Sequence, residues 1–153
     1  MNDPTPARYR KPGWFTQHVF NRAVVALTRA GLSVWGSRIL EVPGRTSGEV
    51  RRVPVNLLSL DGKQYLVSAR GTGQWVRNVR AANGNLDLLV GGSRQHWVAT
   101  ELTDDEKAPV LRAYLRRWKA EVGVFFEGVS ATSSDEELTA AGPKHPVFVL
   151  QTA

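Results

Sequence analysis

The sequence contains no cysteine, which excludes disulfide bonds, thiolate nucleophiles and cysteine-ligated metal sites. Its three histidines, His18, His96 and His145, are scattered, and none is paired with Asp or Glu at the spacing of metal ligands on a helix. No serine lies in the Gly-x-Ser-x-Gly pattern of hydrolase nucleophiles. We therefore expect neither a metal site nor serine hydrolase chemistry, and we expect His145 to be structural.

Long apolar runs are also missing. The longest, from Ala23 to Trp35, is interrupted by Arg29 and is shorter than the roughly 20 residues that span a bilayer. The polar start, Met1 to Pro4, lacks the basic and then apolar order of a signal peptide. We expect a cytoplasmic protein, with peripheral contact at the inner face of the membrane as an open alternative.

Acidic residues are in deficit. There are 14 Asp and Glu against 20 Lys and Arg, which gives a formal net charge of +6 and a pI near 10.2. A basic surface attracts polyanions, whether nucleic acid, anionic lipid or a phosphorylated, carboxylate-rich cofactor. The length of 153 residues fits one domain, which we place over residues 14–153 after a loose tail over 1–13.

Periodicity predicts a mainly β protein with flanking helices. Apolar residues from Phe15 to Gly31 recur at helical spacing. Asp61-Gly62 predicts a hairpin turn, because a type I′ turn needs positive φ at both central residues. Thr103 with Glu106 forms a capping box before another helix, and a further helix begins near Ser134. Strands are expected over 37–42, 51–60, 64–69, 86–90, 95–102 and 146–150, and a short helix over 75–82. Such short antiparallel strands favour a small barrel of about six strands.

The segment from Gly44 to Arg52 is the first of two glycine segments. Its backbone N–H groups could form a concave anion nest, with the Thr46 and Ser47 hydroxyls and the arginines as further donors. It is not a P-loop, because its glycines are one residue too close and Glu49 replaces the lysine. A plain hairpin turn with solvated arginines explains the same residues equally well.

The second segment runs from Ser68 to Asn78, where a strand leads into a glycine loop and then a helix. Gly71 and Gly73 would let a flat, carbonyl-bearing ring approach backbone donors. The third glycine of a dinucleotide fingerprint is missing. Taken alone, the segment is better explained as a strand–helix connection with Trp75 in the core.

Together, in this order, the two segments resemble the deazaflavin-dependent nitroreductase family of actinobacterial type, also described as coenzyme F-420-dependent quinone reductases. The similarity covers about residues 36–151. The matching residues are Gly44-Arg45-Thr46-Ser47-Gly48, Arg51, Pro54, Trp75, Asn78 and Pro146-Val147-Phe148-Val149-Leu150.

The resemblance implies a split β-barrel of the FMN-binding type and a coenzyme, F-420, with a ribityl phosphate and an oligoglutamate tail. It implies hydride transfer from the reduced deazaflavin to a small apolar acceptor: a quinone, an enone or a nitroaromatic. Phosphate and tail would be held by Gly44, Arg45, Thr46, Ser47, Gly48, Arg51 and Arg52. Pro54, Ser68, Ala69, Arg70 and Gly71 would line the ring, and Trp75 and Asn78 would brace the wall.

The acceptor side would be walled by Trp14, Trp118, Phe125 and Phe126. The loop between Gly71 and Trp75 is shorter than in many members, and residues 120–142 contain no Tyr or His that could donate a proton. Two alternatives stay open: FMN in place of the deazaflavin, and a non-enzymatic module that binds nucleic acid or a membrane surface. The expected partner is a small-molecule acceptor, with no nucleic acid and an oligomeric state that the sequence leaves undefined.

Overall fold

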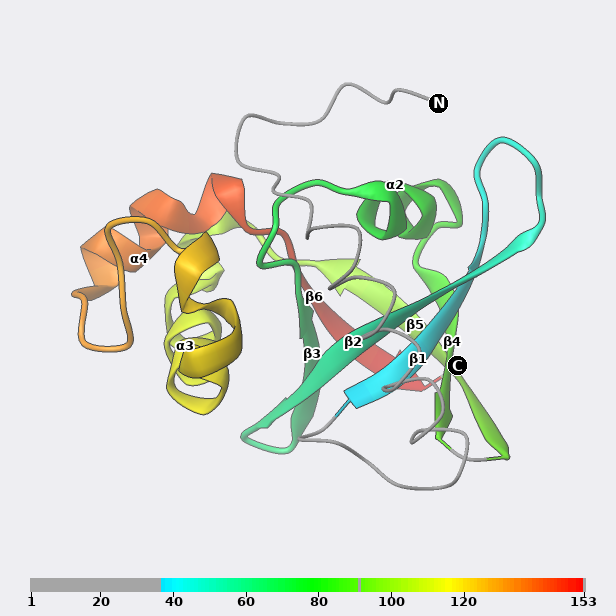
Figure 1. Cartoon of the computed structure of the whole chain (residues 1–153), viewed down its shortest axis with the longest axis horizontal. Coiled ribbons are helices and arrows are strands. Elements are labelled where there is room, and N and C mark those ends of the chain that lie inside the picture. Colours follow the sequence, from blue (N-terminus) through cyan, green and yellow to red (C-terminus); the bar gives the residue numbers. More distant parts are fainter. Residues whose placement is uncertain (1–36, 91, 153) are drawn as a thin grey trace. The chain divides into compact units, whose positions relative to one another are not determined.

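The computed structural model describes residues 37–90 and 92–152 (Figure 1). Six strands form a closed barrel in the order β1-β2-β3-β6-β5-β4. β1 pairs antiparallel with β2 and β4, and β4 with β5. The barrel predicted from the periodicity is confirmed. The strands are β1 Ser37–Pro43, β2 Val50–Leu60, β3 Lys63–Val67, β4 Asn85–Val90, β5 Ser93–Glu101 and β6 Val147–Thr152.

The helices lie where the sequence places caps and apolar stripes. Capping boxes form at Thr103 and at Ser134. Residues 120–131 contain the end of α3 and one short 3-10 turn. A 3-10 turn follows α4 directly at Gly142. The helical elements are α2 Gln74–Ala81, η1 Asp104–Glu106, α3 Ala108–Val122, η2 Gly123–Phe125, α4 Asp135–Ala141 and η3 Gly142–Lys144.

The predicted tail over residues 1–13, the helix predicted from Phe15 and the residue Trp14 lie outside the described residues. Within the described ranges, no helix has the length and apolar character needed to cross a bilayer.

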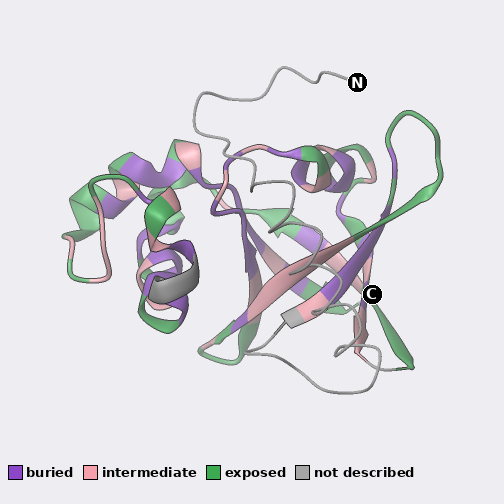
Figure 2. Cartoon of the chain, in the orientation of Figure 1, coloured by how far each residue is buried: buried purple, intermediate pink, exposed green. Residues whose placement is uncertain are grey.

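The described residues divide into two compact units, each treated separately below. The strand-rich unit comprises residues 37–57, 74–90, 92–99 and 150–152, and α2 packs against β1 within it. The helix-rich unit comprises residues 58–73 and 100–149. Its core includes the α3 stripe of Leu111, Tyr114, Leu115 and Trp118, each at most 3% exposed. The buried faces of α3 and β1 are purple in Figure 2.

The turn predicted at Asp61-Gly62 is confirmed, with φ of 52° and 78° at its two residues. A second left-handed pair, Asn83 and Gly84, ends α2 in the strand-rich unit. The Gly84 N–H donates to the Val79 carbonyl, and the Gly84 carbonyl accepts from the Ala99 N–H at 2.8 Å. A Cβ built on Gly84 would lie 2.1 Å from the Ala99 carbonyl oxygen, so only glycine fits.

We expect Gly84→Ala to lower the free energy of unfolding by at least about 2 kcal/mol, because positive φ and a backbone clash coincide. For a chain of this size the melting temperature should fall by about 4–8 °C. Gly92→Ala is the control, because a Cβ there meets nothing within 4 Å. Thermal unfolding of the two variants checks this, and equal melting temperatures would contradict the packing described.

Candidate functional site

The loop between β1 and β2 closes on itself. The Gly44 N–H donates to the Glu49 carbonyl at 2.7 Å, and the Gly48 N–H to the Gly44 carbonyl at 2.9 Å. The Glu49 N–H donates to Ser47 Oγ at 3.1 Å. The Arg45 N–H also has a protein partner, Asn78 Oδ1, so four N–H groups of the predicted nest are bonded within the protein. Of the described residues between Gly44 and Glu49, Thr46 and Ser47 are the two whose amides have no such bond, and both residues are exposed.

Asn78 fixes this loop to α2. Its Oδ1 accepts from the Arg45 backbone N–H at 3.0 Å and from Arg45 Nη1 at 2.9 Å. Nη1 also donates to Gln74 Oε1 at 2.9 Å. Asn78 is 5% exposed, so losing these bonds would leave a buried amide oxygen unsatisfied. Arg45 is therefore held in a defined position, and Gln74 is a contributor that the sequence analysis did not name.

Arg51 lies against the same loop. Its Nη2 is 3.4 Å from Ser47 Oγ. A Cβ on Gly44 would lie 3.1 Å from Arg51 Nε and 3.2 Å from Ser47 Oγ, so the glycine makes room for the guanidinium. Two guanidinium groups, a hydroxyl and two exposed amides form a donor set that suits phosphate and carboxylate oxygens. These residues fit the acidic part of the coenzyme that the resemblance implies.

Arg52 points to a different partner. Neighbouring residues of a strand face opposite sides of the sheet, so Arg51 and Arg52 cannot both face the loop. Arg52 Nε lies 2.5 Å from Glu41 Oε2, and the register aligns these two residues on β2 and β1. The structure therefore does not bring Arg52 to the donor set, although the sequence analysis grouped it with Arg51.

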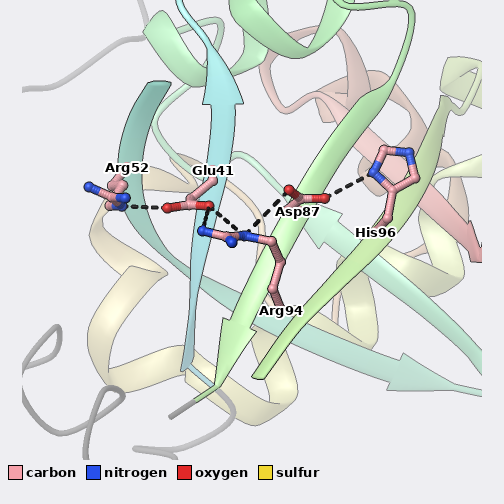
Figure 3. Close-up of polar contacts among 5 residues, drawn as sticks. All are labelled: Glu41, Arg52, Asp87, Arg94 and His96. Carbon is pink, nitrogen blue, oxygen red and sulfur yellow. Dashed lines mark hydrogen bonds and ion pairs between the residues drawn. The ribbon is translucent and has the colours of Figure 1, made fainter. Parts of the chain in front are cut away.

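The Arg52–Glu41 pair belongs to a charge ladder of five residues across β2, β1, β4 and β5 (Figure 3). Glu41 Oε1 accepts from Arg94 Nη2 at 2.8 Å and from Arg94 Nε at 3.0 Å. Asp87 lies 3.6 Å from Arg94 and 2.9 Å from His96 Nδ1. The ladder pairs side chains up to 53 positions apart, which no local sequence pattern indicates.

Glu41 is 6% exposed yet charged. Burial raises the pKa of its carboxyl group, but the hydrogen bonds and positive charges of Arg52 and Arg94 outweigh this. The pKa of Glu41 therefore lies below its ordinary value. A lowered pKa in the folded state contributes stability that is present above the unfolded-state pKa. That stability is lost as the pH falls through the folded-state pKa.

We expect Glu41→Gln to lower the free energy of unfolding at neutral pH by about 1 kcal/mol, since both arginines are half exposed and screened by solvent. The difference from wild type should shrink as the pH falls from about 7 to about 3, because acid neutralises Glu41 in the wild type. Denaturant unfolding across this range checks the sign. Glu49→Gln, at an exposed loop position, is the control. A pH-independent difference would contradict the role of the Glu41 charge.

The second glycine segment lies in the helix-rich unit and begins with a tight turn. The Ser68 hydroxyl donates to the Gly71 carbonyl, and the Gly71 N–H lies 3.4 Å from the Ser68 carbonyl oxygen. Gly71 has a φ of 96°, which favours glycine. Ser68 and Ala69 are buried, and Arg70 is half-buried, with its guanidinium carbon 5.0 Å from the centre of the Phe125 ring.

The residues predicted to wall the acceptor side differ in exposure. Trp118 and Phe126 are 2% and 3% exposed and pack in the core of the helix-rich unit. Phe125 is half-buried beneath Arg70. Of the three described residues, only Phe125 is partly exposed. The assignment of these residues to a substrate wall stays a prediction.

The predicted site residues thus divide between the units. The strand-rich unit contains Gly44, Arg45, Thr46, Ser47, Gly48, Arg51, Arg52, Pro54, Trp75 and Asn78, and the helix-rich unit contains Ser68, Ala69, Arg70, Gly71, Trp118, Phe125 and Phe126. Pro54 and Trp75 are half-buried, on β2 and α2.

Comparison with known proteins gives a family and a fold. A family model described as F-420H(2)-dependent quinone reductase matches residues 14–132. A solved structure described as an F-420-H2 dependent reductase (FDR-A) has a TM-score of 0.52 at 20% identity, over 76% of this chain and 94% of that one. A protein of unknown function from Agrobacterium tumefaciens has a TM-score of 0.53 at 16% identity, over 93% of this chain and 59% of that one. No curated protein matches the chain. The structural matches establish the split-barrel fold.

Proposed function

Because this chain belongs to the F-420H(2)-dependent quinone reductase family, and so is an oxidoreductase that uses coenzyme F-420, we propose that its acceptor is a small apolar molecule. Quinones are the first candidates, with enones and nitroaromatics as further classes. The family match over residues 14–132 carries this proposal. The basic donor set around Arg45 and Arg51 supports it, because the coenzyme's phosphate and carboxylates need such partners.

The residues of each unit have separate tasks in this proposal. In the strand-rich unit, Arg45, Arg51 and Ser47 bind the phosphate and the acidic tail. In the helix-rich unit, the turn from Ser68 to Gly71 presents backbone to the deazaflavin ring, and Phe125 contacts the acceptor. When bound, the reduced coenzyme supplies the hydride, so the protein contributes binding, orientation and exclusion of water. A positive net charge assists capture of the acidic ligand.

Arg51→Ala should weaken coenzyme binding by about tenfold, the effect of one lost charge-assisted hydrogen bond to an anion. It should also reduce the salt dependence of binding, because one fewer charge contacts the ligand. Arg52→Ala is the matched control on the opposite face of β2 and should bind within about twofold of wild type. Fluorescence titration at two salt concentrations measures both, and equal losses would mean that the two arginines are not divided between faces in this way.

Mixing the protein with reduced coenzyme and a quinone should restore the visible absorbance of the oxidised deazaflavin. Phe125→Ala should raise the KM for the acceptor and leave coenzyme affinity unchanged, because the ring is assigned to the acceptor alone. Val124→Ala, next to it and 63% exposed, serves as the control. Turnover supported by FMN and not by the deazaflavin would overturn the coenzyme assignment, and turnover with a polar acceptor in preference to all three apolar classes would overturn the acceptor proposal.

A further inference from the structure

The charge ladder ends at a histidine whose two ring nitrogens both lie beside oxygen atoms. His96 Nδ1 lies 2.9 Å from Asp87 Oδ1, a contact drawn in Figure 3. His96 Nε2 lies 3.2 Å from Asn85 Oδ1. Asn85 and Asp87 are two positions apart on β4, so they share a face of the sheet, and the register pairs Asp87 with His96 on β5. All three residues belong to the strand-rich unit.

The orientation of the Asn85 amide is fixed by its other end. Its Nδ2 donates to the Ala82 carbonyl at 2.9 Å, and the same carbonyl accepts from the Asn85 backbone N–H at 3.1 Å. Exchanging the nitrogen and oxygen of this amide would place two acceptors against each other at Ala82. Oδ1 is therefore the atom that faces His96. Because Ala82 directly follows α2, the amide also connects the end of that helix to β4.

These contacts select one protonation state of His96. An ionised carboxylate and an amide oxygen can only accept hydrogen bonds. A neutral imidazole has one N–H, so it can donate to Asp87 or to Asn85, and its other nitrogen then turns a lone pair toward the remaining oxygen. The imidazolium form has two N–H groups and donates to both. Its positive charge also attracts the Asp87 carboxylate.

The charged groups around His96 are few. Asp87 contacts its ring, and the other oxygen of that carboxylate lies 3.6 Å from Arg94, which is in turn paired with Glu41. Arg80, in the last turn of α2, has the same sign as the imidazolium. β6, which adjoins β5 in the barrel, has no titratable side chain. Among the described residues, Asp87 is the acidic group in contact with His96.

We propose that His96 is a pH-sensitive clamp that joins β5 to β4 and to the end of α2. With both nitrogens protonated, the ring donates to Asp87 and to Asn85, and Asn85 in turn bonds Ala82. As the pH rises through the range of about 5 to 8 in which histidine titrates, the ring loses one proton and one of its two contacts becomes repulsive. The clamp acts on the helix that carries Asn78. It requires no ligand and is independent of the proposed acceptor.

Denaturant unfolding at about pH 5.5 and about pH 8.5 tests the clamp, because a proton held by the folded state stabilises it at the lower value only. His96→Gln is neutral at both values. Its folding equilibrium constant should be lower than that of wild type by about threefold to fivefold at the lower pH, the size of a half-exposed ion pair. At the higher pH the two proteins should nearly coincide. Gln95→Ala, at the preceding position on the opposite face of β5, is the control and should show no pH-dependent difference.

Asn85→Ala distinguishes the clamp from a simple ion pair between His96 and Asp87. The variant loses the bond to Ala82 at every pH, so this loss cancels when the two pH values are compared. It also removes the oxygen that a neutral ring would face. We therefore expect its deficit relative to wild type to be larger at the lower pH than at the higher pH. An equal deficit at both would mean that Nε2 donates nothing to Asn85, and the clamp would be disproved.

Two other results would overturn the proposal. The first is a folded His96→Gln variant that is as stable as wild type at the lower pH. The second concerns zinc, because a metal cation between Nε2 and Oδ1 would satisfy both lone pairs as a proton does. Zinc that stabilises wild type but not His96→Gln at the higher pH, and that EDTA reverses, would indicate a metal site instead. Should His96→Gln not fold, the comparison of Asn85→Ala with wild type decides the question by itself.

Discussion

The buried oxygen of Asn78 is the contact on which the strand-rich unit's candidate site depends. It lies on α2, is shielded from solvent, and accepts from both the backbone and the side chain of Arg45. A buried amide oxygen is costly to leave without donors, so the positions of α2 and of the β1–β2 loop are coupled. The loop arginine is consequently placed before any ligand arrives, which reduces the entropy that binding must offset.

The alternation of side chains along β2 gives two adjacent arginines different partners. Arg51 and Arg52 are adjacent, but β2 directs them to opposite faces. One lies beside Ser47 and Gly44 in the loop, and the other joins Glu41 in the charge ladder. The two arginines and two carboxylates of the ladder balance one another's charge, and together with His96 they link neighbouring strands. The loop arginines instead contact neutral groups of the strand-rich unit: Arg45 contacts Asn78 and Gln74, and Arg51 contacts Ser47.

In both glycine segments, several backbone polar groups are hydrogen-bonded to other groups of the protein. In the β1–β2 loop, four amides are bonded within the protein, and in the turn after β3 the carbonyls of Ser68, Ala69 and Gly71 have protein donors. This internal bonding leaves few groups for a ligand but fixes the directions of those few. The turn depends on His145, 76 residues away in the chain, so its geometry is a property of the helix-rich unit as a whole.

Local patterns in the sequence determined the elements of this protein. The strand periods, the Asp61-Gly62 turn and the capping boxes at Thr103 and Ser134 each depend on residues within a few positions of one another, so each was predictable. The family resemblance likewise identified the coenzyme class.

Which polar groups of the candidate site bond to which partners was decided only by the tertiary structure. The assignment of Arg52 to Glu41, the use of the loop amides, the burial of Trp118 and Phe126, and the bond from His145 to Ala69 all join distant segments. Strand register and core packing bring those segments together, and neither can be derived from the spacing of residues along the chain.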